Sequence, residues 1–145
     1  MPPSRITAVC AAAIIAALYV VGLVSGTSLR HVVQTAPLLL AVVLGWRRSP
    51  SARWIALPFF LFWLTIMVLI WTFLLGWSHF LSGHFSPAEI AMTVVIAVAA
   101  AAGIVQTVCE QGGRSVVGAA AAFLVGAVLQ AAAFRISLLP GIATR

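Results

Sequence analysis

The sequence predicts an all-α integral membrane protein: one domain, built as a bundle of five transmembrane helices with short loops. Of its 145 residues, 63% are hydrophobic and only 7% are charged, a balance that cannot cover a water-soluble domain of this size with polar surface. Residues 54–77 contain no charged side chain, and as a helix they would span a hydrocarbon core of about 30 Å. We therefore expect a lipid bilayer, rather than water, to surround most of the chain and to be its principal partner.

Five apolar runs define the expected spans, at residues of about 6–26, 32–46, 54–77, 87–108 and 115–138. The first run is longer than the apolar part of a secretory signal peptide and no convincing cleavage site follows it, so we expect a retained helix. The second run is the shortest, and four spans remain if it does not cross. Within it, Pro37 should free a backbone carbonyl that neighbouring helices or the Thr35 hydroxyl can satisfy.

Local sequence signals indicate where helices begin and end. Ser49 and Pro50 have the residue types of an N-cap and a first helical residue for the central helix. Residues 86–89, Ser-Pro-Ala-Glu, match a capping box that begins the fourth helix. Gly112 and Gly113 should stop that helix. Because residues 110–114 form a short linker, we expect the last two helices to pack as an antiparallel hairpin.

Small residues recur on the last predicted helix. Gly118, Ala122 and Gly126 lie four residues apart, so they share one helix face and let another helix backbone approach closely. Residues 138–141, Leu-Leu-Pro-Gly, should end this helix. The stripe is the main reason to expect a homo-oligomer or an association with another membrane subunit.

The charges indicate a topology rather than a nucleic-acid partner. The formal net charge is +6, and the arginines fall between the apolar runs, where they meet anionic headgroups. Arg47, Arg48 and Arg53 stand in one short loop between Trp46 and Trp54. Arginines beside span ends favour the cytoplasm and tryptophans favour the headgroup level, so this loop, residues 47–53, is expected on the cytoplasmic side of an inner membrane.

The side of the N-terminus depends on the number of spans. Five spans with a cytoplasmic start and four spans with an external start each place five arginines inside and three outside, so charge does not choose between them. In both arrangements the 78–86 loop and Glu89 lie on the outer face. With five spans, the outer half of the bundle also gathers a set of polar side chains: Arg30, His31, Gln34, Gln130 and Arg135.

The outer histidines are the sharpest candidates for chemistry. His31, His79 and His84 are candidates to bind a haem or another cofactor, and His79, His84 and Glu89 are the candidate metal ligands, because imidazole and carboxylate groups suit such sites. The alternatives are that the loop histidines sit among lipid headgroups or sense pH, while Glu89 only caps its helix. Since their spacing matches no helical ligand pair, we predict no cofactor.

Other polar and sulfur-containing residues give weaker indications. Gln34, Gln106 and Gln130 are polar intramembrane residues that could line a transport path or a quinone pocket, although interhelical hydrogen bonds are their commoner role. Cys10 and Cys109 form no redox or zinc motif, and we expect both to be buried.

The chain lacks a nucleophile with its base and lacks paired carboxylates, so we do not expect an enzyme. The first functional hypothesis is a non-enzymatic accessory or assembly subunit of a membrane complex. The alternatives are a small transporter or channel with a polar vestibule on the outer side, and a membrane anchor that binds haem, quinone or metal through the outer histidines.

Overall fold

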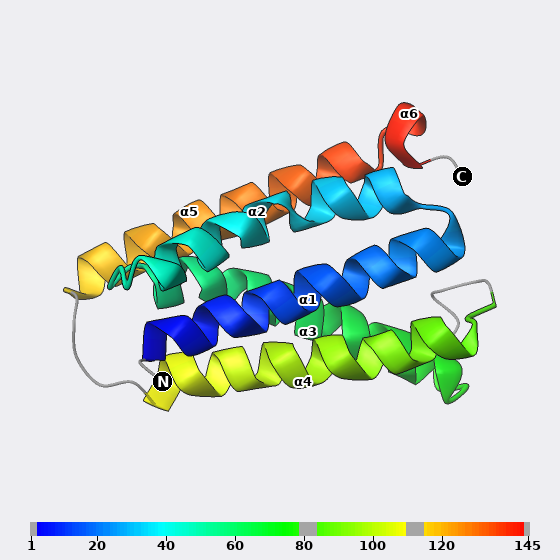
Figure 1. Ribbon diagram of the computed structural model, residues 1–145, viewed down its shortest axis with the longest axis horizontal. Helices are drawn as coiled ribbons and strands as arrows, with labels where there is room; N and C mark the ends of the chain where they lie inside the picture. Colours follow the sequence, from blue (N-terminus) through cyan, green and yellow to red (C-terminus); the bar gives the residue numbers. More distant parts are fainter. Residues whose placement is uncertain (1–2, 79–83, 110–114, 144–145) are drawn as a thin grey trace.

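The computed structural model describes residues 3–78, 84–109 and 115–143, and helices account for nearly all of them (Figure 1). The helices are α1 (Pro3–Ser25), α2 (Ser28–Trp46), α3 (Ala52–Leu74), α4 (Pro87–Cys109), α5 (Val116–Ser137) and the short α6 (Pro140–Ala143). In these described ranges, five helices are long and apolar enough to cross a membrane. The prediction of an all-helical bundle is confirmed, and the short second run lies within a helix of 19 residues.

Two helices end earlier than the hydropathy suggested because glycine supplies a left-handed turn. Gly26 and Gly76 have φ values of 70° and 74°, which side chains with a Cβ rarely adopt. After Gly26, the Thr27 N–H donates to the Gly22 carbonyl at 2.8 Å, and after Gly76 the Trp77 N–H donates to the Thr72 carbonyl at 2.9 Å. This is the Schellman pattern. It lets α2 begin at Ser28, earlier than expected, and ends α3 before Trp77.

The start of α4 agrees with the sequence, whereas the start of α3 does not. The Ser86 N–H donates to Glu89 Oε2 at 2.7 Å and the Glu89 N–H donates to Ser86 Oγ at 3.3 Å, so the capping box is confirmed. At α3 the Ala52 N–H donates to the Ser49 carbonyl at 3.1 Å. Ser49 and Pro50 therefore form a β-turn ahead of the helix rather than its cap, because proline suits the second turn position equally well.

The helices are arranged around the bundle in the order α1, α2, α5, α3, α4. Figure 1 shows α4 and α5 along opposite sides of the molecule, and their described residues make no contact. The predicted hairpin of the last two helices is therefore wrong. A short linker requires the two helices to run in opposite directions, but it does not require them to touch. Here α3 lies between them and contacts both.

The surfaces of α3 that face α4 and α5 each meet a glycine of that helix. On α4, a Cβ at Gly103 would clash with the Phe60 ring, with Phe60 Cδ2 only 2.6 Å away. On α5, a Cβ at Gly126 would fall against the Ile55 carbonyl oxygen and 2.8 Å from Pro58 Cγ. Close helix approach of this kind is what small residues permit.

The small-residue stripe is therefore used, in part, within a single chain. Gly126 and Ala122 are both buried, and Gly126 faces α3 of the same molecule. Gly118 lies near the start of α5, where its N–H donates to the Ser115 hydroxyl at 3.2 Å as part of an N-cap.

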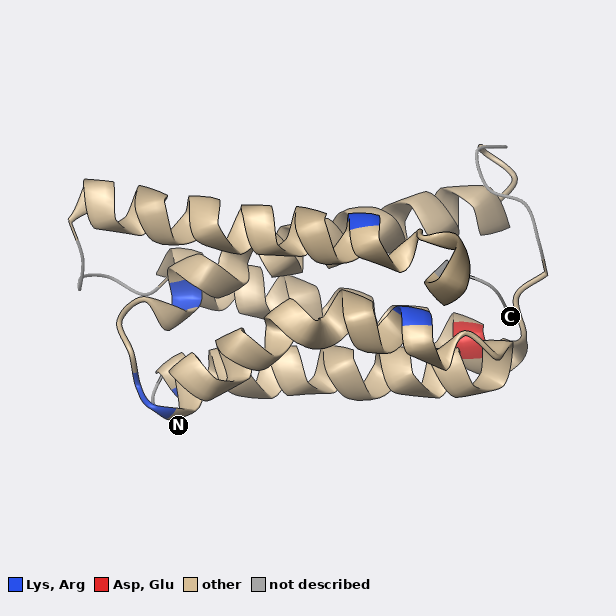
Figure 2. Ribbon diagram, turned by 90° about the horizontal axis from the view of Figure 1, so that it is seen from above, with Lys and Arg blue, Asp and Glu red and all other residues tan. Residues whose placement is uncertain are grey.

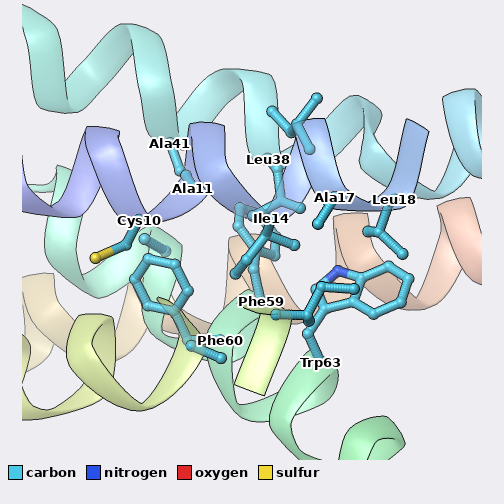
Figure 3. Packing of buried hydrophobic residues seen from close by; sticks show 14 of the residues in the cluster. Cys10, Ala11, Ile14, Ala17, Leu18, Leu38, Ala41, Phe59, Phe60 and Trp63 are labelled. Atoms are coloured by element: carbon cyan, nitrogen blue, oxygen red, sulfur yellow. The ribbon is translucent and has the colours of Figure 1, made fainter. Parts of the chain in front are cut away.

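The core lies where α1, α2, α3 and α4 meet. Ile14, Leu38, Phe59 and Phe60 have no more than 1% of their surface exposed, and Trp63 is also buried. Figure 3 shows the rings of α3 packed against aliphatic side chains of α1 and α2. This cluster fills the middle of the bundle.

Several individual predictions need correction. Cys10 is buried as expected, but Cys109 is exposed at the end of α4, because it occupies the last helical residue. The Thr35 hydroxyl donates to the His31 and Val32 carbonyls at 2.9 and 3.1 Å, and not to the Val33 carbonyl that Pro37 frees. Pro140 does not only end the last helix: it begins α6, as its fixed φ permits.

The two ends of the bundle differ in charge, as Figure 2 shows. The arginine-rich end, where α1 and α3 begin and α2 ends, holds Arg5, Arg47, Arg48 and Arg53. There the Arg5 guanidinium lies 5.7 Å from the Trp46 ring centre and that of Arg53 lies 5.3 Å from Trp54. Such pairs of arginine and tryptophan are typical of a headgroup region.

Candidate functional site

A cavity of about 360 Å³ opens at the other end of the bundle, called here the pocket end. Five helices surround it: α1 and α3 with their C-terminal halves, α2 and α4 with their N-terminal halves, and α5 with Phe134. The polar lining residues are Ser25, Thr27, Arg30, His31, Gln34, Glu89 and Thr93. The apolar lining consists mainly of Leu18, Phe62, Trp63, Ile66, Met67, Ile70, Phe85, Ile96 and Phe134.

His31 is oriented by the turn between α1 and α2. Its Nδ1 lies 3.0 Å from the Thr27 carbonyl oxygen and 3.2 Å from the Thr27 hydroxyl, and that hydroxyl shares a hydrogen bond with Ser25. A carbonyl oxygen can only accept, so Nδ1 carries a proton in this arrangement. In the neutral ring, Nε2 is then an acceptor.

Two opposite charges stand beside this histidine. Arg30 precedes it in the first turn of α2, and Glu89 comes from the first turn of α4. Arg30, His31 and Glu89 all line the same cavity, so the three groups lie in one neighbourhood. Glu89 is held there by the capping box, because its Oε2 accepts the Ser86 N–H.

Gln34 connects α2 with α5. Its side chain is buried, and its Nε2 donates to the Ser137 hydroxyl at 3.0 Å. The Ser137 hydroxyl donates in turn to the Phe134 carbonyl at 2.7 Å. This chain of bonds ties α2 to the end of α5, beside the Phe134 ring that closes one wall of the cavity.

The apolar wall comes chiefly from one face of α3. Trp63, Ile66, Met67 and Ile70 recur at three- and four-residue spacing, so they project from the same side of the helix. Phe62 and Phe134 meet edge-on, with ring centres 5.2 Å apart. Together these side chains give the cavity an apolar interior below a polar mouth.

Some candidate residues from the sequence do not reach this cavity. His84 is exposed and does not line it, and His79 lies outside the described residues. Within the described ranges no three side chains of histidine, cysteine, aspartate or glutamate come together as a metal site would require. His31 and Glu89 share the cavity, but His84 does not join them.

Gln130 and Arg135 lie in a different place from the other outer polar residues. They line a shallow groove between α3 and α5, and the edge-on pair of Phe62 and Phe134 separates this groove from the cavity. Gln130 is 2% exposed, and neither of its amide atoms has a hydrogen-bond partner among the described residues. Gln106 is half-buried on α4, toward the arginine-rich end.

Sequence reasoning missed the apolar half of the cavity and one polar residue. Thr93 follows Glu89 by four residues and therefore lies on the same face of α4. This spacing is visible in the sequence and could have identified Thr93. The α3 residues also show regular spacing, but almost every position of that helix is apolar. Its inward face therefore could not be recognised from hydropathy.

The fold and the cavity together define a bundle of apolar, span-length helices with an amphipathic pocket at one end. The chain matches no protein-family model, no curated protein and no solved structure.

Proposed function

We propose that this chain is a multi-pass protein of a cell inner membrane that binds a small amphipathic molecule in the cavity at its pocket end. The observation that carries the proposal is a cavity of about 360 Å³ with an apolar interior and a charged mouth. Ligand sites in proteins fall in the range of about 300–1,000 Å³ and combine these two kinds of lining.

The membrane strengthens this argument. Charged and strongly polar side chains within a span are costly when they face lipid, so they face cavities or one another. Arg30, His31 and Glu89 all face the same cavity. An amphipathic ligand could place its polar group among them and its apolar part against Trp63 and Ile66.

A titration in nonionic detergent tests this function. The delipidated protein is mixed with a monoacylglycerol, dioctanoyl phosphatidylglycerol, dioctanoyl phosphatidylethanolamine or phenylalanine, and bound copies are counted by native mass spectrometry. We expect one copy of at least one probe. Ile66→Trp should weaken this binding because the larger indole projects into the cavity and takes space from the ligand, whereas Leu61→Trp, at an exposed position of α3, should preserve it. Equal binding by both variants, or no binding of any probe to the native chain, would refute the proposal.

We further propose that the arginine-rich end faces the cytoplasm and that the pocket end faces outward. Four described arginines lie at the first end, whereas Arg30, Arg135 and Glu89 belong to the other half, and positive charge favours the cytoplasmic side. The pocket would then receive its ligand from the outer leaflet or from the external solution.

The two cysteines provide a test of this orientation without any substitution. Cys109 is exposed at the arginine-rich end and Cys10 is buried, so only Cys109 should react with a membrane-impermeant maleimide in the folded protein. We expect labelling in inverted vesicles and none in intact cells. Labelling in intact cells would show that the proposed orientation is wrong. As a control, both cysteines should react after denaturation.

The accessory-subunit function and the transport function stay predictions. Because Gly126 packs against α3 of its own chain, it no longer supports an interface with a second subunit. Transport would require an opening through the buried cluster of Phe59, Phe60 and Trp63.

A further inference from the structure

The mouth of the pocket presents a positive and a negative group that are not paired with each other. Arg30 and Glu89 both line the cavity. In the part of the chain that the structure describes, no ion pair joins the two and no hydrogen bond occupies the Arg30 guanidinium. Among the described residues, the guanidinium N–H donors of Arg30 therefore remain open to a ligand at the cavity.

The opposite side of the mouth presents acceptors. Glu89 uses Oε2 to accept the Ser86 N–H, which leaves Oε1 as an acceptor on a charged carboxylate. His31 commits Nδ1 to the Thr27 carbonyl, which leaves Nε2 as an acceptor in the neutral ring. The Glu89 acceptor lies on α4, where the capping box holds the side chain. The His31 acceptor lies on α2, where the contact with Thr27 holds the ring.

A ligand with a single charge would meet one like charge in this mouth. An anionic headgroup is attracted by Arg30 but repelled by Glu89, and a cationic headgroup has the reverse problem. A dipolar headgroup satisfies both residues at once.

We propose that the ligand of this pocket is a zwitterion with an apolar body, bound with its anionic group at Arg30 and its ammonium group at Glu89 and His31. The inference rests on the proposed function, because it specifies the headgroup of the amphipathic ligand. The apolar body lies against the α3 wall, formed by Trp63 and Ile66. Two sources carry this chemistry: a phosphoethanolamine lipid headgroup, and the amino-carboxylate of an apolar amino acid.

The experiment compares dioctanoyl phosphatidylethanolamine, dioctanoyl phosphatidylglycerol and phenylalanine by titration calorimetry on the detergent-solubilised full chain. The native protein should bind at least one of the two zwitterions about tenfold more tightly than phosphatidylglycerol, the scale of one charge-assisted hydrogen bond. Binding of the phospholipid alone identifies a lipid headgroup as the source, and binding of phenylalanine alone identifies a free solute.

Two charge-removing variants then test the assignment of each group. Glu89→Gln keeps the cap, because glutamine also accepts the Ser86 N–H. This variant should bind the zwitterion about tenfold more weakly and phosphatidylglycerol more tightly than the native protein. Arg30→Gln should weaken both phospholipids. Arg135→Gln removes a charge from the same half of the bundle but does not line the cavity, so it should change neither affinity. The gain of phosphatidylglycerol binding in Glu89→Gln cannot result from misfolding.

The inference and the proposed function fail in different ways. If the native protein binds phosphatidylglycerol as tightly as the zwitterions, the pocket stands and the headgroup assignment is wrong. The assignment is equally wrong if Arg30→Gln and Glu89→Gln match Arg135→Gln. If no probe binds, the proposed function itself is wrong.

Discussion

The contact between α5 and α3 at Gly126 gives a direct test of how this bundle is packed. A Cβ added there would lie against the Ile55 carbonyl oxygen and 2.8 Å from Pro58 Cγ, which is 0.6 Å short of the 3.4 Å where ordinary contact begins. One neighbour is backbone and the other is a proline ring, so neither can rotate away. Gly126→Ala must therefore push the two helices apart.

The expected loss of stability follows from two opposing effects. Overpacking a well-filled contact costs roughly 1–3 kcal/mol, while alanine gains about 1 kcal/mol over glycine in helix propensity. Because one neighbour is backbone and the other is a ring, the upper part of the overpacking range, about 2–3 kcal/mol, applies, and Gly126→Ala should lower the free energy of unfolding by about 1–2 kcal/mol. For a chain of this size that corresponds to a fall in Tm of roughly 5 °C.

Thermal unfolding followed by circular dichroism in detergent measures this shift, and light scattering during size-exclusion chromatography measures the oligomeric mass. Ala121→Val is the matched control, since Ala121 is exposed on α5; its Tm should stay at the native value. If Gly126→Ala keeps the native Tm but changes the oligomeric mass, the glycine packs between chains and the reasoning from the fold is refuted.

Substitutions at three further positions test the polar contacts by the same thermal assay. Gln34→Ala removes the donor to Ser137 and should cost roughly 0.6–1.7 kcal/mol, the range for hydrogen bonds between membrane helices. Gln130→Leu should raise the Tm, because it removes a buried amide without a partner among the described residues. Ser86→Ala removes one bond of the capping box and should cost about 1 kcal/mol, whereas Ser86→Asp should retain most of the stability. A Tm that falls equally for Gln34→Ala and Gln130→Leu would contradict the different roles assigned to the two amides.

The features predictable from the sequence are those that depend on neighbouring residues. The apolar runs fix the helical character and the approximate spans, and the Ser86–Glu89 box fixes the start of α4. These signals are local, because helix length, hydropathy and capping depend on residues a few positions apart. The turn at Ser49 and Pro50 shows their limit: the same dipeptide suits a helix start and a β-turn.

The candidate site was predictable in part. Arg30, His31, Gln34 and Glu89 were expected on one face of the membrane, and the structure brings all four to one cavity. Gln130 and Arg135 were expected with them but lie behind the aromatic pair in another groove. Position along a span indicates depth in the membrane, but it does not indicate which side of the helix faces the cavity.

The sequence by itself determined that this chain forms apolar helices of membrane-spanning length, and which loops carry the arginines. Only the tertiary structure decided that α3 separates α4 from α5, that Gly126 packs within the chain, and that Trp63 and Ile66 line a pocket. In water, an amphipathic pattern marks the inward face of a helix. In a bilayer, lipid and core are equally apolar, so the shapes of the side chains decide which faces meet.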